Sequence, residues 1–559
     1  MNQRGSIAWW LVLAIAGAFA IYLLGNARIP LLDRDEPRYA QTSRNMLQTG
    51  DWVVPVFLGQ LRTAKPPLIY WCQASVMRIL GDTPFAARLP SASAMTLTLS
   101  ILGIVIWKTV SARHALWTVV VLATSVLALT AAKMCITDSL LLLWITIAQL
   151  CVYALWRGRR SWSLVLILAL ATGLAGLTKG PVVLGVSGTT LLVLAALRYF
   201  DSRRQTNLLP PPPTVDRHTW GTALFKILVA TAIVFGIVLL WVVPLEQRSP
   251  GFIRTTILHD VVGRVKKPLE GPKGAPGFYL LTIWGTFLPW SLLLPAAAVS
   301  AWRQRHRPEI RFAIAAVLGP WVMFELVQTK LPHYLLPVFP ALGFLVADML
   351  LRNARGEVNL LTGRAFAIGA GIWAIAILLL GLAPWLAVRF FDNLPYLAMA
   401  IVNEVALLYS QLVFHQFRRQ RFLPAAGVMG AGFPMLLACI YTLFVPRAWF
   451  LHLPEAIAAE LRKAGATQVG QVVMIDYKEP SLGFYQGGTI READDTILQQ
   501  PATAPTAERT LPKFVVISQT AWSRQPDAVR SQYAQIAALR GWNYAGKGRI
   551  QTILILEHR

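Results

Sequence analysis

Long apolar runs alternate with short polar gaps along most of this chain. About thirteen such runs precede residue 446, and a helix needs roughly 17–25 apolar residues to cross a bilayer. The pattern predicts an all-α polytopic membrane domain, because only helices and closed barrels satisfy their own backbone in lipid. The predicted spans are 7–24, 86–107, 115–132, 138–156, 161–178, 181–197, 225–243, 278–300, 312–328, 334–351, 365–383, 395–414 and 423–445.

The chain changes character after residue 446. Short apolar stretches replace the long runs, and one segment has the spacing of an amphipathic helix. We expect residues 1–445 to form the transmembrane domain and residues 446–559 to form a soluble α/β domain outside the membrane. The predicted elements of this second domain are a helix over 454–464 and strands at Val472–Ile475, Phe514–Ile517 and Thr552–Leu556.

Arginine is concentrated in alternate gaps between the predicted spans, and these gaps contain few acids. Short loops rich in Lys and Arg face the cytoplasm, so the N-terminus is expected inside and the tail outside. We expect the site to form in outer loops 25–85 and 244–277. The remaining outer segments are the turns near Lys133 and Lys179, the turn Lys330–Tyr334 and the tail.

Composition supports a membrane protein and changes how its charge is interpreted. The 559 residues are 55% hydrophobic and 14% charged, whereas soluble domains carry about 25% charged residues. Mean hydropathy is +0.52. The net charge of +25 would indicate nucleic acid in a soluble protein, but here inner-loop arginine accounts for much of it. We therefore expect anionic headgroups or a phosphate-bearing lipid substrate as partners, and no nucleic acid.

The first outer gap is crowded with charge. Residues 33–40 read Asp-Arg-Asp-Glu-Pro-Arg-Tyr-Ala, directly after the first apolar run. Asp35 precedes a predicted helix that ends near Gly50, with Pro37 in its first turn. Asp35 could be a simple helix cap, but a cap explains one acid and not the whole cluster. The density of charge favours an active site at the membrane face.

A second predicted helix begins at the prolines after Lys65 and lies in the interface to about Leu80. Lys65 would face the headgroup layer, where an anionic phosphate lies. A snorkelling lysine without a functional role is the alternative interpretation.

Several short motifs occur in a consistent order over residues 5–445. They are Asp35–Ala40, Gly50–Pro55, Lys65–Leu68, Leu177–Pro181, Phe287–Trp290 and Lys330–Pro337. This ordered set resembles the bacterial membrane glycosyltransferases of the GT-C superfamily, which are related to protein O-mannosyltransferases. Within that superfamily it resembles the lipid A aminoarabinose transferases. The motifs are specific for the superfamily and less so for the acceptor.

The resemblance implies an enzyme that takes a sugar from a polyprenyl phosphate in a single inverting displacement. The expected reaction transfers 4-amino-4-deoxy-L-arabinose from undecaprenyl phosphate to lipid A phosphates at the periplasmic face of the bacterial inner membrane. Its consequence would be resistance to polymyxin and other cationic peptides. The alternatives are transfer of another sugar to protein or glycan, a lipid transporter or flippase, and a structural or receptor-like membrane protein.

The resemblance also suggests site residues. Asp35 and Asp138 match the two acids of the family. Cations placed where phosphate charge develops would stabilise the leaving group, and charge-assisted bonds to phosphate are strong. The predicted donor-phosphate ligands are Lys65, Arg38, Arg264, Lys330, His333 and Tyr334. Further candidates are Glu36, Tyr39, His259, Tyr70 and Glu325.

Two of these assignments carry explicit alternatives. Asp138 begins a predicted span, so it could be a helix N-cap; as a site residue it needs a cationic neighbour, for which Lys133 is a candidate. His259 and His333 could make ordinary polar contacts. Asp35 is expected to position the acceptor or the ammonium group of the donor sugar, because a phosphate acceptor is already anionic near neutral pH.

No cofactor motif is present in the sequence, and the scattered cysteines form no zinc-binding pattern. Whether a divalent cation takes part is left open. The expected partners are the undecaprenyl-phosphate-linked sugar, lipid A and membrane lipids, and the protein is expected to be a monomer.

Overall fold

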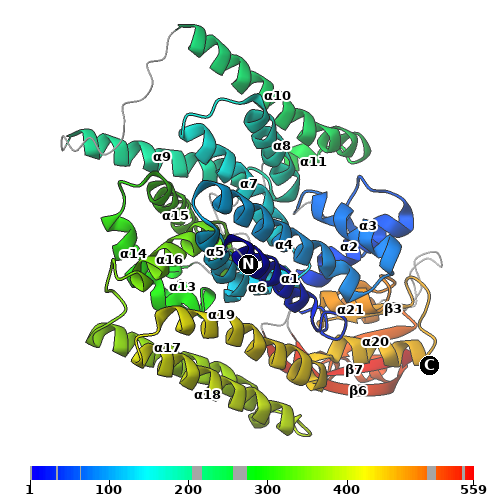
Figure 1. Cartoon of the computed structure of the whole chain (residues 1–559). Coiled ribbons are helices and arrows are strands. Elements are labelled where there is room, and N and C mark those ends of the chain that lie inside the picture. Colours follow the sequence, from blue (N-terminus) through cyan, green and yellow to red (C-terminus); the bar gives the residue numbers. More distant parts are fainter. Residues whose placement is uncertain are drawn as a thin grey trace.

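Apolar helices make up most of the computed structural model, which describes residues 3–32, 35–62, 65–203, 217–255, 274–499, 512–543 and 548–559. The helices form one body with a small sheet domain at one end (Figure 1). The first helices of the body are α1 (Gln3–Leu23), α4 (Pro84–Thr109), α5 (Ala112–Thr124), α6 (Val126–Lys133), α7 (Asp138–Trp156), α8 (Trp162–Lys179), α9 (Val182–Arg203) and α10 (Arg217–Arg248).

The second half of the body contains more broken helices. They are α13 (Phe278–Thr286), η2 (Trp290–Leu293), α14 (Leu294–Arg303), α15 (Pro308–Leu326), η3 (Pro332–Val338), α16 (Phe339–Ala354), α17 (Arg364–Leu382), η4 (Ala383–Arg389), α18 (Tyr396–Arg418) and α19 (Phe422–Cys439). The centre of the body is the η3–α16 span, of which 83% is buried, whereas 6% of the span Gly221–Arg248 in α10 is buried. Apolar side chains exposed on α10 suit contact with lipid.

The predicted all-α membrane domain is confirmed, but the count of about thirteen spans is not. The described residues contain ten helices long and apolar enough to cross a membrane, or eleven if a bent pair is one span. That pair is α5 and α6, which meet at an angle of 66° where 115–132 was predicted to be continuous. The predicted span 278–300 is divided into α13, η2 and α14, in a segment containing Pro289 and Pro295. The predicted span 312–328 corresponds to α15, which begins at Pro308 and therefore also carries Glu309 and Arg311 besides Glu325, so this helix is not among the ten.

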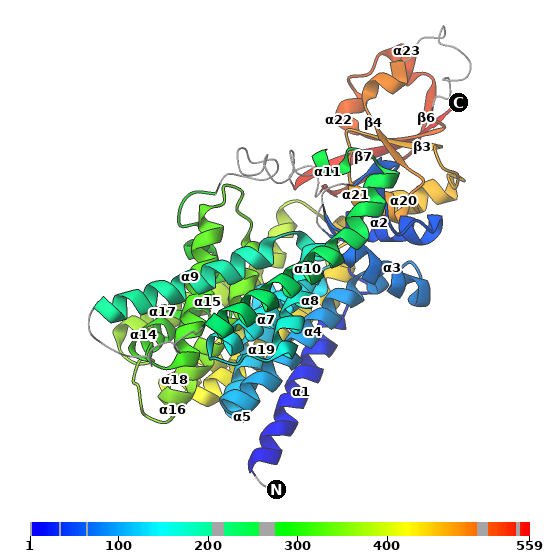
Figure 2. The ribbon, with the colours of Figure 1, turned by 90° about the horizontal axis from the view of Figure 1, so that it is seen from above.

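The outer segments cover one end of the helical body. They are α2 (Glu36–Thr49), the hairpin of β1 (Val56–Phe57) and β2 (Gln60–Leu61), α3 (Leu68–Leu80) and α11 (Phe252–Thr255). Figure 2 shows α2 and α3 beside the sheet domain, and the N-terminus at the opposite end of α1. The two ends of the helical body are therefore chemically distinct.

The tail folds as a five-stranded sheet in the order β4-β3-β5-β7-β6. β3 is parallel to β4 and β5, whereas β7 is antiparallel to β5 and β6. The predicted helix and the three predicted buried strands correspond to α20, β3, β5 and part of β7. The elements from residue 440 onward are η5 (Ile440–Phe444), η6 (Val445–Arg447), η7 (Trp449–Leu451), α20 (Leu453–Lys463), β3 (Val472–Ile475), α21 (Pro480–Tyr485), β4 (Arg491–Ala493), η8 (Asp495–Gln499), β5 (Phe514–Ser518), α22 (Gln519–Trp522), α23 (Asp527–Arg530), β6 (Tyr533–Asn543) and β7 (Arg549–His558).

The sheet domain is docked on α2 through Arg44. This buried guanidinium donates to the Phe484 carbonyl oxygen at 2.6 Å and lies 3.8 Å from the centre of the Phe484 ring. It also pairs with Asp82 at 3.2 Å. The Tyr485 hydroxyl accepts a hydrogen bond from the Leu31 backbone N–H at 2.8 Å. α21 therefore holds both the start of the first outer segment and the helix that follows it.

A buried ion pair joins the first outer segment to α4. Arg88 donates to both carboxylate oxygens of Glu36, at 2.9 and 2.8 Å. It also donates to the carbonyl oxygens of Asn26, Ile29 and Pro30. These five bonds match the five N–H donors of a guanidinium. The chain between α1 and α2 is thus wrapped around one arginine.

The Glu36 carboxylate is equally well satisfied. It accepts from the backbone N–H groups of Leu32 and Cys135 at 2.9 and 3.0 Å, besides its bonds to Arg88. Both members of the pair are buried, with side-chain exposures of 2% for Arg88 and 1% for Glu36. The cost of removing an ion pair from water is offset only when its remaining hydrogen-bonding groups are paired, as they are here.

We predict that Arg88→Met destabilises the protein by about 3–5 kcal/mol, because it leaves the Glu36 carboxylate buried without a cation. Adding Glu36→Gln should recover part of this loss, since it removes the unpaired charge and keeps an acceptor for the Cys135 N–H. Unfolding of the detergent-purified variants measures both effects. Strictly additive effects of the two substitutions would contradict the coupling.

Candidate active site

Asp138 and Lys179 form the centre of the candidate site. Asp138 is the first residue of α7 and Lys179 is the last residue of α8, and their charged atoms are 2.8 Å apart. Both side chains are largely buried, with exposures of 8% and 14%. His333 and Lys65 lie close enough to interact electrostatically with the same carboxylate. Helix ends from distant parts of the sequence therefore gather charge at one point.

Lys133 is not the partner of Asp138, so that prediction is wrong. Its ammonium donates instead to the carbonyl oxygens of Ile21 and Leu24, at 3.1 and 2.5 Å, at the end of α1. The last carbonyl groups of a helix lack partners within it, so a lysine there satisfies them. The alternative interpretation of Asp138 as a helix cap is also wrong, because the cap position is Thr137.

The η3 turn contributes His333 and Tyr334. The two rings lie 5.0 Å apart in an edge-to-face arrangement. The Lys179 ammonium lies 5.2 Å from the centre of the Tyr334 ring. The structure thus brings His333 and Tyr334, both expected in the site, beside the Asp138–Lys179 pair.

Two buried tyrosines form another wall. The rings of Tyr39 on α2 and Tyr70 on α3 lie 5.6 Å apart. Arg62 donates to the Tyr70 hydroxyl at 2.8 Å and lies 4.9 Å from the centre of the Tyr39 ring. Asp35 interacts electrostatically with Tyr39, Tyr70 and Arg62, and Asp138 interacts with Tyr39. The tyrosines therefore connect the Asp35 loop to the Asp138 pair.

The protonation of these two phenols follows from burial. Burial raises the pKa of Tyr39 well above its usual value, and the nearby Tyr70, Asp35 and Asp138 raise it further although Arg62 opposes them. Burial also raises the pKa of Tyr70, against the lowering effect of Arg62. Both phenols therefore stay protonated even at alkaline pH and keep a proton that they can donate.

Asp35 lies at the start of α2 and is exposed. It occupies the N-cap position, yet its side chain makes no capping hydrogen bond to the helix. The interpretation of Asp35 as a simple cap is therefore wrong. Its carboxylate remains at the surface of the cluster, next to buried aromatic and basic groups.

Glu325 and Lys330, both predicted site residues, bind each other. Their charged atoms are 2.9 Å apart, and the Lys330 side chain is 4% exposed. Glu325 also accepts from the backbone N–H groups of Gly277 and Phe278 at 2.6 and 3.1 Å, at the start of α13. A role for Lys330 in holding the donor phosphate would require this pair to open. Glu36 has a similar structural role, because Arg88 and two backbone groups use its carboxylate.

The remaining predicted site residues are Arg38, Lys65, Arg264 and His259. Arg38 on α2 and Lys65 before α3 are half-buried and have partners within the protein. Arg264 and His259 lie outside the described residues. Within the described part of the chain, no three His, Cys, Asp or Glu side chains gather as a metal site requires.

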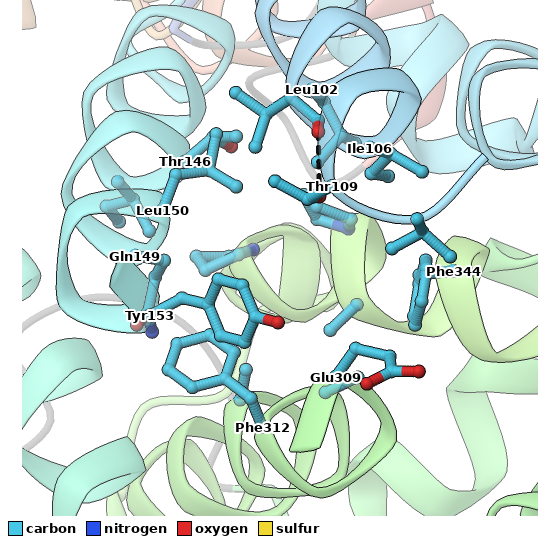
Figure 3. Close-up of a pocket in the computed structure, with 18 residues that line it drawn as sticks. Leu102, Ile106, Thr109, Thr146, Gln149, Leu150, Tyr153, Glu309, Phe312 and Phe344 are labelled. Atoms are coloured by element: carbon cyan, nitrogen blue, oxygen red, sulfur yellow. Dashed lines mark hydrogen bonds between the residues drawn. The ribbon is translucent and has the colours of Figure 1, made fainter. Parts of the chain in front are cut away.

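An apolar cavity of about 100 Å³ lies deeper in the helical body. Figure 3 shows Leu102, Tyr153, Phe312 and Phe344 around it, from α4, α7, α15 and α16. Glu309 lies at its edge. The lining comes from the halves of α4 and α7 remote from Arg88 and Asp138, so this cavity is separate from the charged cluster.

Comparison with known proteins agrees with the arrangement. The profile of the dolichyl-phosphate-mannose-protein mannosyltransferase family matches residues 7–254. The undecaprenyl phosphate-alpha-4-amino-4-deoxy-L-arabinose arabinosyl transferase of Serratia proteamaculans is 27% identical over 453 residues, which are 79% of this chain and 77% of the relative. The enzyme of the same name from Yersinia enterocolitica is 30% identical over 397 residues, 68% of this chain and 66% of the relative.

The fold has also been seen in a solved structure. The crystal structure of ArnT from Cupriavidus metallidurans bound to undecaprenyl phosphate superposes with a TM-score of 0.74, at 20% identity, over 98% of each chain. Its apo form gives the same TM-score at 21% identity, over 99% of this chain and 98% of that chain. This chain belongs to the aminoarabinose transferase family of GT-C membrane glycosyltransferases.

Three cations of this glycosyltransferase were not identified as functional groups from the sequence. Lys179 lies in a motif recognised for its resemblance to the family, but nothing in the sequence links it to Asp138, 41 residues earlier. Arg62 reaches the tyrosines from the end of a hairpin. Arg88 lies inside an apolar helix, where a buried charge signals a partner or a function. That last signal was available in the sequence.

We predict that Lys179→Met lowers the rate of sugar transfer by about 10²–10³-fold, the usual cost of removing one preorganised electrostatic group. Lys463→Met is the matched control, because Lys463 is also ion-paired, with Glu460, but lies 71% exposed on the sheet domain. Turnover by purified protein measures the effect. Equal rates for the two variants would exclude a role for Lys179 in the reaction.

Proposed function

We propose that this glycosyltransferase transfers 4-amino-4-deoxy-L-arabinose from undecaprenyl phosphate to phosphate groups of lipid A at the periplasmic face of the inner membrane. The observation that carries the proposal is the cationic cluster around Asp138, at the end of the helical body where the sheet domain is docked. The names of the relatives support the donor sugar and its carrier. The modified lipopolysaccharide would bind polymyxin and other cationic peptides less well, because an added amine reduces its negative charge.

The leaving group of this reaction is a phosphate monoester on a lipid. Negative charge grows on it as the bond to the sugar breaks, so nearby cations stabilise the transition state more than the ground state. Lys179 and Lys65 lie near Asp138 and suit this role, and the His333 ring beside them can donate a hydrogen bond to a phosphate oxygen. Arg62 and Tyr334 lie on neighbouring walls of the cluster.

Asp35 is the acid most accessible to a substrate. A phosphate acceptor is already anionic near neutral pH, since its second pKa is about 6, so it needs no strong base. We assign Asp35 to holding the ammonium of the donor sugar or orienting the acceptor. Asp138, which already binds Lys179, keeps that cation in place.

Sidedness follows from the same arrangement. Arginines of the helix ends and connections remote from the cluster, such as Arg157 and Arg303, would face the cytoplasm by the positive-inside rule. The N-terminus of α1 lies at that end, and the sheet domain lies at the other (Figure 2). The proposed enzyme therefore has a cytoplasmic N-terminus and a periplasmic C-terminal domain.

Expression in a bacterial strain that lacks its own transferase tests the function. Lipid A is expected to gain the mass of one or two aminoarabinose groups, measured by mass spectrometry. An unchanged lipid A, together with another sugar on protein or glycan, would contradict the proposed acceptor and donor. Movement of a lipid without any covalent change would favour a flippase.

The role of Asp35 is tested separately. We predict that Asp35→Asn lowers turnover on lipid A by about 10²-fold or more, within the range for groups that act directly on a transition state. The control is Asp392→Asn, an exposed acid in the connection between η4 and α18. Full activity of Asp35→Asn would show that this carboxylate neither holds nor orients a substrate.

A further inference from the structure

A second cavity, lined by both polar and apolar side chains, lies at the end of the helical body opposite the charged cluster. It has a volume of about 420 Å³, within the roughly 300–1,000 Å³ typical of sites for small ligands. The starts of α1, α5 and α19 and the end of α16 line it. Arg88, near the start of α4, lies at the end of the body that carries the charged cluster. α4 ends at Thr109 and α5 begins three residues later, which places this cavity at the opposite membrane face. Figure 2 shows the N-terminal end of α1 on that side, away from the sheet domain.

Positive charge lines the cavity. Arg113 and Arg355 both contribute to its wall and both are exposed. Arg355 pairs with Glu357 at 2.7 Å, and its side chain remains 52% exposed, so it can turn toward an added anion. None of the described residues that line the cavity is acidic.

The start of α5 adds donors to the same wall. The Ser111 hydroxyl caps this helix by accepting from the His114 backbone N–H, and it lies 2.7 Å from His114 Nδ1. His114 Nε2 lies 3.3 Å from Asp348, which holds the ring in place behind the cavity. A helix start presents N–H groups and a partial positive charge to an anion, here between two arginines.

Tryptophans set the depth of the cavity in the bilayer. Trp10 and Trp117 both line it, and Trp10 is 60% exposed. Tryptophan is concentrated where headgroups meet the hydrocarbon core. The α1 span is only 17% buried, so a lipid in the surrounding membrane can approach along this helix. The cavity is thus basic, roomy and open at the level of the headgroups.

We propose that this cavity binds the phosphate headgroup of an anionic phospholipid in the leaflet opposite the active site. Arg113 and Arg355 bind the phosphate oxygens, and the start of α5 contributes its N–H groups. Trp10 and Trp117 pack against the glycerol and upper acyl region. Basic pockets between membrane helices on the inner face are known to take lipid phosphates. The site is independent of the sugar transfer reaction and of the identity of its acceptor.

Native mass spectrometry of the full-length protein in detergent tests this site. The protein is titrated with phosphatidylglycerol, with zwitterionic phosphatidylethanolamine, and with inorganic phosphate as a competitor. Arg113→Gln combined with Arg355→Gln is expected to weaken phosphatidylglycerol binding by at least about tenfold, since the change removes both charged donors to the phosphate. Binding of phosphatidylethanolamine should be weaker and should change little.

The matched control is Arg159→Gln with Arg160→Gln. These two exposed arginines follow α7 at the same membrane face and do not line the cavity, so the control removes the same charge. Equal losses in the two double variants would show a general charge effect and overturn the proposal. If inorganic phosphate competes for the cavity as strongly as phosphatidylglycerol does, the cavity is a site for free phosphate and not for a lipid. Thermal unfolding of each variant confirms that the protein remains folded.

Discussion

The buried pair of Arg88 and Glu36 is the constraint on which the outer half of the molecule depends. A guanidinium inside an apolar helix is stable only with an opposite charge and filled hydrogen bonds. Arg88 obtains both from the segment between α1 and α2, whose carbonyl groups turn toward it. That wrapping fixes where α2 begins, and Asp35 is the residue just before it. The position of the accessible acid therefore depends on a buried ion pair.

The sheet domain strengthens the same segment from the other side. Tyr485 binds the backbone at Leu31, and Arg44 holds the Phe484 carbonyl while its guanidinium covers the ring. α2 is thus fixed at its start by the membrane domain and along its length by the soluble domain. These contacts give the sheet domain a mechanical role at α2. It restrains α2 in addition to the contacts that this helix makes with α3, the hairpin and the membrane domain.

Sequence patterns were most successful where one physical rule dominates. The cost of unsatisfied backbone in lipid makes apolar helices easy to recognise, and the short buried strands of the tail follow the same logic. The rule weakens where helices bend at Ser125 or break near Pro289, since short pieces still contain enough apolar residues to look continuous. α15 is the opposite case, a helix of the body that carries charge. The protein around it shields Arg311, which pairs with Asp201 on α9.

The sequence predicted several residues that lie together in the candidate site, but not which cations pair with them. Asp138, His333, Tyr39 and Tyr70 were expected and lie together, but their cationic partners Lys179 and Arg62 come from segments whose approach is a property of the packed helices. Lys133 is nearer to Asp138 in sequence, yet it satisfies the end of α1. A residue close in sequence is therefore a poor guide to the ion-pair partner when helix ends offer competing hydrogen-bond acceptors.

The distribution of paired and accessible charge indicates how the cluster can hold a phosphate. Lys330 is neutralised by Glu325, and Arg88 by Glu36, so neither offers uncompensated charge to a ligand. Around Asp138 the arrangement differs, because Lys179 pairs with the carboxylate and Lys65 and His333 interact with it electrostatically. A phosphate entering there would meet the Lys179 ammonium in a largely buried setting, where electrostatic attraction is less screened than in water. We propose that Asp138 keeps the Lys179 ammonium in place until a substrate phosphate binds beside it.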